Sequence, residues 1–248
     1  MRISEHVYLV GSGHLGFDLT DPYDCNIYLL DGGSEMAIVD GGSGLGVGQV
    51  QEQITSHGFE LSKLKYLLLT HGHGDHGGGA HVWKKKMPWL NVVGTRETKE
   101  RLSYQGDGGE TMVMAKRHGY YPDDYMLSPC EVDIIIEDGF AINVGNVLLT
   151  VLATPGHCDG HVCYLTRLDG KKMLFAGDMI FSGGRISTQV VSDCRIVDYY
   201  ESVKKGAAQE IDMLLPAHYE FTFKHGHRHF ELALEYFRRL AIPPSVVT

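Results

Sequence analysis

Long apolar runs are missing from this sequence. No stretch approaches the ~18 consecutive apolar residues that a membrane-spanning helix requires. The polar and charged residues 1–6 also lack the hydrophobic region of a secretory signal peptide. We therefore expect a cytoplasmic protein with no membrane partner.

Cysteine is scarce, and its spacing does not suit a thiolate metal site. The five cysteines form no C-x-x-C pair, and their number is odd; they are Cys25, Cys130, Cys158, Cys163 and Cys194. This argues against a disulfide framework and against a zinc site built from thiolates. We expect mostly buried, reduced and structural thiols, with Cys158 the one to examine for reactivity because it follows His157.

Basic residues are in deficit. The chain has 22 Lys and Arg against 31 Asp and Glu, which gives a formal net charge of −9. A nucleic-acid backbone would be repelled unless a strong basic patch opposed it. The only basic run, Lys84 to Lys86, is better explained as the solvated end of a helix. We therefore expect a small-molecule substrate and no nucleic acid.

Several catalytic and nucleotide-binding signatures are also absent. The glycine-rich residues 41–46 lack the Lys-Ser/Thr of a P-loop and the G-x-G-x-x-G order of a dinucleotide site. No G-x-S-x-G elbow or Ser-His-Asp grouping indicates a serine hydrolase. The chemistry must therefore be sought in other residues.

The length of 248 residues, the 43% apolar content and the 31 glycines fit one large α/β domain or two closely packed halves. Apolar patterning predicts strands at residues 7–10, 26–30, 36–39, 66–69, 91–94, 132–136, 147–152, 173–176 and 214–215. Helices are expected near residues 46–57, 76–86, 95–105, 198–208 and 227–240, with Thr95 as an N-cap.

The most informative stretch follows the buried strand at residues 66–69. Three imidazoles and one carboxylate occur within six residues and alternate with glycines: His71, Gly72, His73, Gly74, Asp75 and His76. This spacing does not suit one helix face, so it favours a tight loop that glycine permits. Nitrogen donors with one hard oxygen suit zinc, iron or manganese. The alternative is a histidine-rich surface loop.

Three further potential ligands stand just past predicted strands. His157 follows the strand at residues 147–152, Asp178 follows residues 173–176, and His218 follows residues 214–215. One such placement would mean little, but the repetition indicates a shared metal centre.

These motifs resemble those of a known family. THGHGDHGGG, TPGHCDGH, LFAGD and LLPAH resemble, in the expected order, the metal motifs of the metallo-β-lactamase superfamily, over nearly the whole chain. The resemblance implies an α/β fold, an αβ/βα four-layer sandwich of two mixed β-sheets flanked by helices. It implies a single domain over residues 1–248. Residues 106–130 are too rich in Met and Tyr for a disordered linker, so we expect an insertion that forms a lid or a substrate wall, or alternatively a partner interface.

The resemblance also implies a ligand set. His71, His73 and His157 would hold one metal ion, Asp75, His76 and His218 would hold the second, and Asp178 would bridge the two. Asp40, which ends a strand before the glycine-rich loop, would support the ligands from behind. The implied cofactors are two divalent ions, with zinc preferred and iron or manganese as alternatives.

The chemistry implied by such a pair is hydrolysis. Two divalent ions, the carboxylates of Asp75 and Asp178 and one bridging hydroxide sum to about +1, which favours a neutral or anionic substrate. The hydroxide would cleave a carboxylic ester, thioester or lactone. A phosphodiesterase on the same metals and a mono-iron persulfide dioxygenase are the alternatives, and a homodimer remains open.

Some positions depart from named subgroups. Phe181 stands where lactonases of this superfamily are expected to carry a tyrosine. The text from Gly177 to Gly184 resembles glyoxalase II, but only residues 219–248 follow His218, where those enzymes continue into a helical glutathione-binding domain. True β-lactamases of the superfamily generally lack a bridging aspartate like the one that Asp178 would provide.

Candidate substrate contacts come from three regions. The long connection at residues 11–23 would overhang the site, residues 106–130 are rich in Tyr and Met, and two aromatic residues neighbour Asp178 and His218. The candidates are His14, Phe17, Tyr120, Tyr121, Tyr125, Phe181 and Tyr219. His161 is expected to be structural or to support a ligand, and His225, His227 and His229 to mark a helix start.

Overall fold

The computed structural model describes residues 1–106 and 109–247 and divides the chain into two compact units. The first comprises residues 1–136 with 144–147, and the second comprises residues 137–143 with those from 148 onward. The predicted single domain over residues 1–248 includes positions 107–108 and 248, which lie outside the described ranges, and the predicted insertion at residues 106–130 includes positions 107–108. No helix within those ranges has the length and apolarity needed to cross a bilayer.

The first unit is built on a mixed six-stranded sheet in chain order, β1 to β6. β1, β2 and β3 pair antiparallel, whereas β3, β4, β5 and β6 run parallel. The strands are β1 (Val7–Gly11), β2 (Ile27–Asp31), β3 (Met36–Val39), β4 (Leu64–Leu68), β5 (Asn91–Gly94) and β6 (Ile134–Ile135). β6 is therefore shorter than the strand predicted at residues 132–136, although Asp133 N and Ile136 N also donate to carbonyls of β5, at 2.8 and 3.0 Å.

The first helix of this unit buries a regular apolar stripe. In α1 (Val47–Ser56), Val47, Val50 and Ile54 are buried at the spacing of one helix face. α4 (Arg96–Leu102) begins as predicted, where Thr95 Oγ1 accepts from Thr98 N at 3.2 Å, but it ends three residues before the predicted Gln105. A short 3₁₀ turn, η1 (Leu61–Lys63), precedes β4.

The helix predicted at residues 76–86 is in fact two, α2 (Gly74–Gly77) and α3 (Ala80–Lys86). The chain is diverted at Gly79, whose N–H bonds to Gly42 O at 2.8 Å. A Cβ at Gly79 would lie 2.2 Å from Gly41 O, so the glycine permits this close approach. Trp83 of α3 fixes the same loop through a bond from Nε1 to Gly41 O at 2.9 Å.

The sequence predicted no regular element in residues 106–130, but the structure contains α5 (Glu110–Arg117). Met112, Tyr121, Tyr125 and Leu127 form a buried cluster within this segment. The apolar and aromatic content that excluded a disordered linker thus becomes a small core of its own.

The second unit is built on a mixed five-stranded sheet in the order β11-β10-β9-β8-β7. β10 pairs parallel with β11 and antiparallel with β9, and β8 pairs antiparallel with β9. The strands are β7 (Ala141–Val144), β8 (Val147–Ala153), β9 (Val162–Leu168), β10 (Lys171–Gly177) and β11 (Met213–Pro216). β7 and β9 were not predicted from the sequence.

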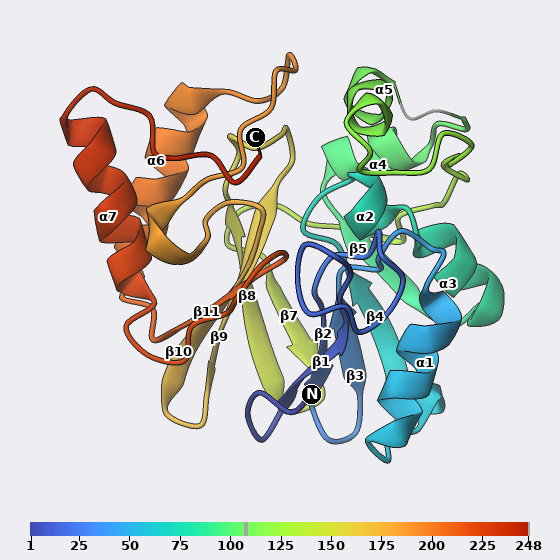
Figure 1. Cartoon of the computed structure of the whole chain (residues 1–248). Helices are drawn as coiled ribbons and strands as arrows, with labels where there is room; N and C mark the ends of the chain where they lie inside the picture. Colours follow the sequence, from blue (N-terminus) through green and yellow to red (C-terminus); the bar gives the residue numbers. More distant parts are fainter. Residues whose placement is uncertain (107–108, 248) are drawn as a thin grey trace. The chain divides into compact units, whose positions relative to one another are not determined.

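Two long helices cover this second sheet, α6 (Ile196–Ala207) and α7 (His227–Arg238), shown in orange and red in Figure 1. Val203 of α6 and Phe230 of α7 share a buried cluster with Leu174 and Leu214 of the sheet. α7 begins at His227, as predicted, and His229 accepts a hydrogen bond at Nδ1 from Gly183 N at 3.1 Å, in the turn η2 (Ser182–Gly184).

Candidate functional site

In each sheet, the candidate ligands follow the carboxyl ends of strands. Asp40 follows β3 and His71 follows β4, and these strands are parallel, so both residues leave the same edge of the first sheet. In the second sheet, β8, β10 and β11 all run in one direction, so His157, Asp178 and His218 leave one edge as well. This is where open α/β sheets place their ligands.

In the first unit, the cluster after β4 brings donor atoms close together. His71 Nε2 lies 3.0 Å from His73 Nδ1, and His76 Nε2 lies 3.4 Å from Asp75 Oδ2. The predicted tight loop is only partly right, because Asp75 and His76 lie in the single helical turn α2. That turn forms because His73 O accepts hydrogen bonds from His76 N and Gly77 N, at 3.1 and 2.7 Å.

Asp40 organises these rings from behind. Its Oδ2 accepts from His76 Nδ1 at 2.9 Å, and its two oxygens accept from Thr70 N and Oγ1 at 2.8–3.0 Å. Thr70 Oγ1 in turn lies 3.0 Å from His71 Nδ1. We assign the proton of each ring to Nδ1. The Asp40 carboxylate accepts from His76, and the Thr70 hydroxyl, which donates its own proton to Asp40, accepts from His71. The Nε2 atoms of both histidines then carry the lone pair that a metal needs.

Thr70 was missed by the sequence analysis, although its position directly before His71 was a usable signal. Asp40 itself has a φ of +63°, a left-handed conformation that aspartate adopts more readily than most residues. Both residues are fully or almost fully buried, so the hydrogen-bond network is shielded from water.

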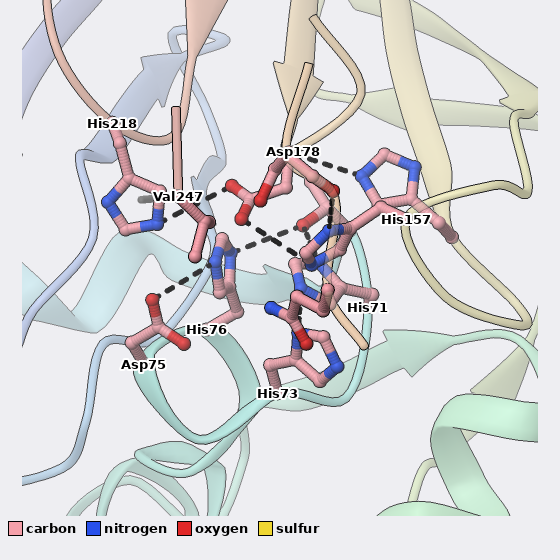
Figure 2. Close-up of polar contacts among 12 residues, drawn as sticks. His71, His73, Asp75, His76, His157, Asp178, His218 and Val247 are labelled. Atoms are coloured by element: carbon pink, nitrogen blue, oxygen red, sulfur yellow. Dashed lines mark hydrogen bonds and ion pairs between the residues drawn. The ribbon is translucent and has the colours of Figure 1, made fainter. Parts of the chain in front are cut away.

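In the second unit, Asp178 lies between two histidine rings (Figure 2). Its Oδ2 is 3.5 Å from His157 Nε2, and its Oδ1 is 3.4 Å from His218 Nε2. His157 Nδ1 donates to Ser187 O at 2.9 Å, which leaves the lone pair of that ring on Nε2. The carboxylate thus presents one oxygen to each histidine.

These spacings fit divalent metal ions. Ligand bonds of about 2.0–2.2 Å in tetrahedral geometry place neighbouring donor atoms roughly 3.3–3.5 Å apart. The contacts of Asp75 with His76 and of Asp178 with His157 and His218 measure 3.4–3.5 Å, which is long for a hydrogen bond. Donor type and spacing in each unit therefore suit a metal such as zinc.

Asp75 is also held by Tyr121, from the segment after α5. Tyr121 OH donates to Asp75 Oδ1 at 2.5 Å and accepts from Asp75 N at 2.9 Å. Burial raises the pKa of Tyr121, and the Asp75 charge raises it further, so the phenol stays protonated and acts as the donor. Tyr125 stacks on Tyr121 with ring centroids 5.0 Å apart, and its hydroxyl donates to Ser43 O at 2.6 Å.

Asp178 is supported by two residues of its own unit. His161, which the sequence assigned to a structural or supporting role, accepts at Nε2 from Asp178 N at 3.0 Å. Tyr199 OH contacts Ser187 O at 2.7 Å and Asp178 O at 3.1 Å. Nothing in the sequence distinguished Tyr199 from any other residue of the helix face that α6 buries.

Three other predicted substrate contacts, His14, Phe17 and Tyr120, are exposed or half-buried. His14 has a 70% exposed side chain and pairs with Asp18 at 2.5 Å, and Phe17 is 39% exposed. Tyr120 is half-buried beside the cluster that contains Tyr121. These three residues remain predictions as substrate contacts.

Phe181 and Tyr219 pack together in the second unit. Phe181 is fully buried, and its ring centroid lies 5.9 Å from that of Tyr219 and 6.4 Å from that of His218. Tyr219 is half-buried, and its hydroxyl donates to Val246 O at 3.2 Å. Their predicted contact with a substrate also remains a prediction.

All five cysteines are free thiols, and four of them are buried. The Sγ of Cys25 lies within 4.8 Å of ligand-type atoms of Asp40 and His76, a proximity that the sequence did not indicate. Burial raises the pKa of the Cys25 thiol well above its ordinary value, so this thiol is protonated when no metal is bound. Burial likewise raises the pKa of Cys130 to about 11.

Comparison with known proteins places this chain in a family. The family model of the Metallo-beta-lactamase superfamily matches residues 20–218. The acyl-coenzyme A thioesterase MBLAC2 is 28% identical over 247 residues in both Homo sapiens and Bos taurus. Each alignment covers 90% of this chain and 82% of the relative.

Solved structures show the same fold. BJP-1, a subclass B3 metallo-beta-lactamase of Bradyrhizobium japonicum, has a TM-score of 0.73 at 22% identity, covering 97% of this chain and 92% of that one. A metallo-beta-lactamase family protein from Thermus thermophilus has a TM-score of 0.73 at 23% identity, covering 96% and 82%. The predicted fold class, two mixed sheets flanked by helices, is confirmed. The chain therefore belongs to the metallo-beta-lactamase superfamily, as a metal-binding hydrolase.

Proposed function

We propose that this protein hydrolyses a carboxylic thioester, ester or lactone with two divalent metal ions, and that a thioester is the foremost substrate class. The thioester is favoured by the two curated relatives, both named acyl-coenzyme A thioesterases. Zinc is the preferred metal for the donor set, with iron or manganese as alternatives.

The proposed ligand set follows the order of the family's motifs along the chain. His71, His73 and His157 would hold one ion, Asp75, His76 and His218 would hold the other, and Asp178 would belong to both. The observation that carries the proposal is the Asp178 carboxylate, which presents Oδ2 to His157 and Oδ1 to His218. A carboxylate with its two oxygens divided in this way suits a ligand shared between two ions.

When bound, such a metal pair lowers the pKa of a water toward neutrality and polarises a carbonyl oxygen. The carboxylates of Asp75 and Asp178 would neutralise only part of the charge of two divalent ions. The positive charge that remains would favour the oxyanion of acyl transfer. The Nδ1 bonds of His71, His76 and His157 hold these rings in place, so the proposed ligands are oriented before a metal or a substrate binds.

The substrate proposed is a small neutral or anionic molecule, in keeping with the excess positive charge of the metal pair. A formal net charge of −9 disfavours nucleic acid. A cytoplasmic location and a possible homodimer stay part of the proposal. Because the family's β-lactamases generally lack a shared aspartate, Asp178 also disfavours an antibiotic as the native substrate.

A hydrolysis panel with the metal-loaded protein tests this function. It includes acyl-coenzyme A esters of several chain lengths, acylglutathiones, aliphatic lactones, aryl esters, β-lactams and bis-nitrophenyl phosphate. His71→Ala should lose activity on every hydrolysed substrate, whereas His57→Ala, which removes an exposed histidine outside the ligand set, should keep it.

Thioester turnover above that of the other compounds is the expected result. Activity confined to bis-nitrophenyl phosphate would replace the acyl assignment with a phosphodiesterase. If the whole panel is inert and oxygen is consumed with a persulfide, the protein is the mono-iron dioxygenase instead.

A further inference from the structure

Tyr121 makes two hydrogen bonds to a single candidate ligand. Its hydroxyl donates to Asp75 Oδ1 at 2.5 Å and accepts from Asp75 N at 2.9 Å. The tyrosine is only 7% exposed, so these bonds do not compete with bulk water. Both the backbone and the carboxylate of Asp75 are therefore fixed by one phenol.

The phenol is itself held rigidly. Tyr125 stacks on it with an interplanar angle of 19°, and Met112 shares the same buried cluster. A Cβ at Gly74 would lie 2.6 Å from Met112 Cε and 3.2 Å from Tyr121 Cε1, so the segment packs directly on the start of α2. Glycine at position 74 is what allows this contact.

The bonds leave a specific atom of Asp75 for a metal. With Oδ1 bonded to the phenol, Oδ2 faces His76 Nε2 at 3.4 Å. On the far side of the His76 ring, Nδ1 is fixed by Asp40 at 2.9 Å. The two donor atoms that face each other are thus each oriented by an outer partner, Tyr121 for the carboxylate and Asp40 for the imidazole.

We propose that Tyr121 is a positioning residue that sets the affinity of the metal ion held by Asp75 and His76, and thereby links its buried cluster with Met112 and Tyr125 to metal binding. This inference rests on the proposed function, which makes Asp75 a ligand. It gives Tyr121 a role other than the substrate contact predicted from the sequence, because the phenol acts through Asp75.

The first experiment compares Tyr121→Phe with Tyr125→Phe in the full-length protein loaded with zinc. Each variant loses one buried hydroxyl from the same cluster, but among the described residues the Tyr125 hydroxyl bonds backbone carbonyls of Ser43 and Gly74 and no carboxylate. Metal content is measured by elemental analysis and affinity by chelator competition. Tyr121→Phe should bind one ion about 10–100-fold more weakly, and Tyr125→Phe should retain wild-type affinity for both.

Thermal unfolding of the metal-free variants separates positioning from general damage. Similar unfolding midpoints for the two variants, together with different zinc affinities, support the inference. Equal affinities in Tyr121→Phe, Tyr125→Phe and wild type overturn it, as does an equal loss in both variants.

A double-mutant cycle with Asp75→Ala tests the route of the effect. If Tyr121 acts through Asp75, Tyr121→Phe should not weaken zinc binding further in the Asp75→Ala background. An undiminished further loss overturns the inference while leaving the ligand assignment intact. If Asp75→Ala alone keeps both ions at wild-type affinity, the ligand assignment of the proposed function fails, and the inference fails with it.

Discussion

His161 orients a candidate ligand, Asp178, although it is not itself one of the proposed ligands. Its Nε2 accepts from Asp178 N at 3.0 Å, and its Nδ1 lies 2.9 Å from Thr154 Oγ1. With the proton on Nδ1, the ring donates to the threonine and accepts from the backbone of Asp178. Gly177, directly before Asp178, has a φ of +51°, so backbone and imidazole together direct the carboxylate.

Replacing His161 should therefore affect metal binding through Asp178. His161→Phe keeps an aromatic ring but removes the acceptor, and we expect zinc affinity to fall about 10–100-fold. His161→Gln can retain an acceptor near Nε2 and should lose much less. Chelator competition measures both affinities, and equal affinities in the two variants would show that the ring only fills space.

A loss of stability is also expected in His161→Phe. The Asp178 N–H would be left buried without this acceptor, which costs about 1–3 kcal/mol in the free energy of unfolding. Urea unfolding of the metal-free protein measures this cost separately from metal binding. An unchanged midpoint would mean that the Asp178 amide finds another acceptor.

Among the helices and strands, local signals were predicted better than distant ones. β3 and β5 match their predicted ranges, because each is a short apolar run bounded by clear turn residues. β9 was missed because it follows directly on the TPGHCDGH text and is defined by pairing with β8 and β10. α5 was missed because it lies in a segment without clear periodicity.

The candidate ligands themselves were predictable because each stands just after a local apolar strand signal. Their supports were harder to predict, since they come from remote parts of the chain. Tyr121 and Asp75 are 46 positions apart, and Tyr199 and Asp178 are 21 apart. A hydrogen bond between such residues leaves no periodic trace in one sequence, so it becomes visible only when the chain is folded.

The packing of α6 against α7 gives a prediction on helix stability. A Cβ at Gly206 of α6 would lie 2.2 Å from Phe230 Cε1 of α7, so Gly206→Ala forces the phenyl ring to move. We expect a loss of about 1–3 kcal/mol in the free energy of unfolding, even though alanine favours the helix.

Gly48→Ala in α1 is the matched control, because no atom of residues 1–106 or 109–247 lies within 4 Å of its added Cβ. It should stabilise the protein by about 0.5–1 kcal/mol. Urea unfolding measures both variants. Stabilisation by both would mean that α7 moves away from Gly206 without cost.

For the whole chain, the proposed ligands are divided between the two compact units. His71, His73, Asp75 and His76 belong to the first, and His157, Asp178 and His218 to the second. Because the proposed ions would bind the folded chain, metal binding and the free energy of unfolding should be linked.

Chelation tests this link. The protein purified under mild conditions should contain close to two metal ions per chain by elemental analysis. Because metal binds the folded chain, each bound ion should raise the free energy of unfolding by about 4 kcal/mol when free metal is about 1,000 times its Kd, and a chelator should remove this gain. Asp178→Asn should weaken metal binding and lower only the metal-dependent part of the free energy of unfolding, since the other ligands remain.

A reproducible single ion would contradict the paired site, and an unfolded metal-free Asp178→Asn protein would show that Asp178 is chiefly structural. An unfolding midpoint that ignores the chelator would mean that folding of the two units does not depend on metal.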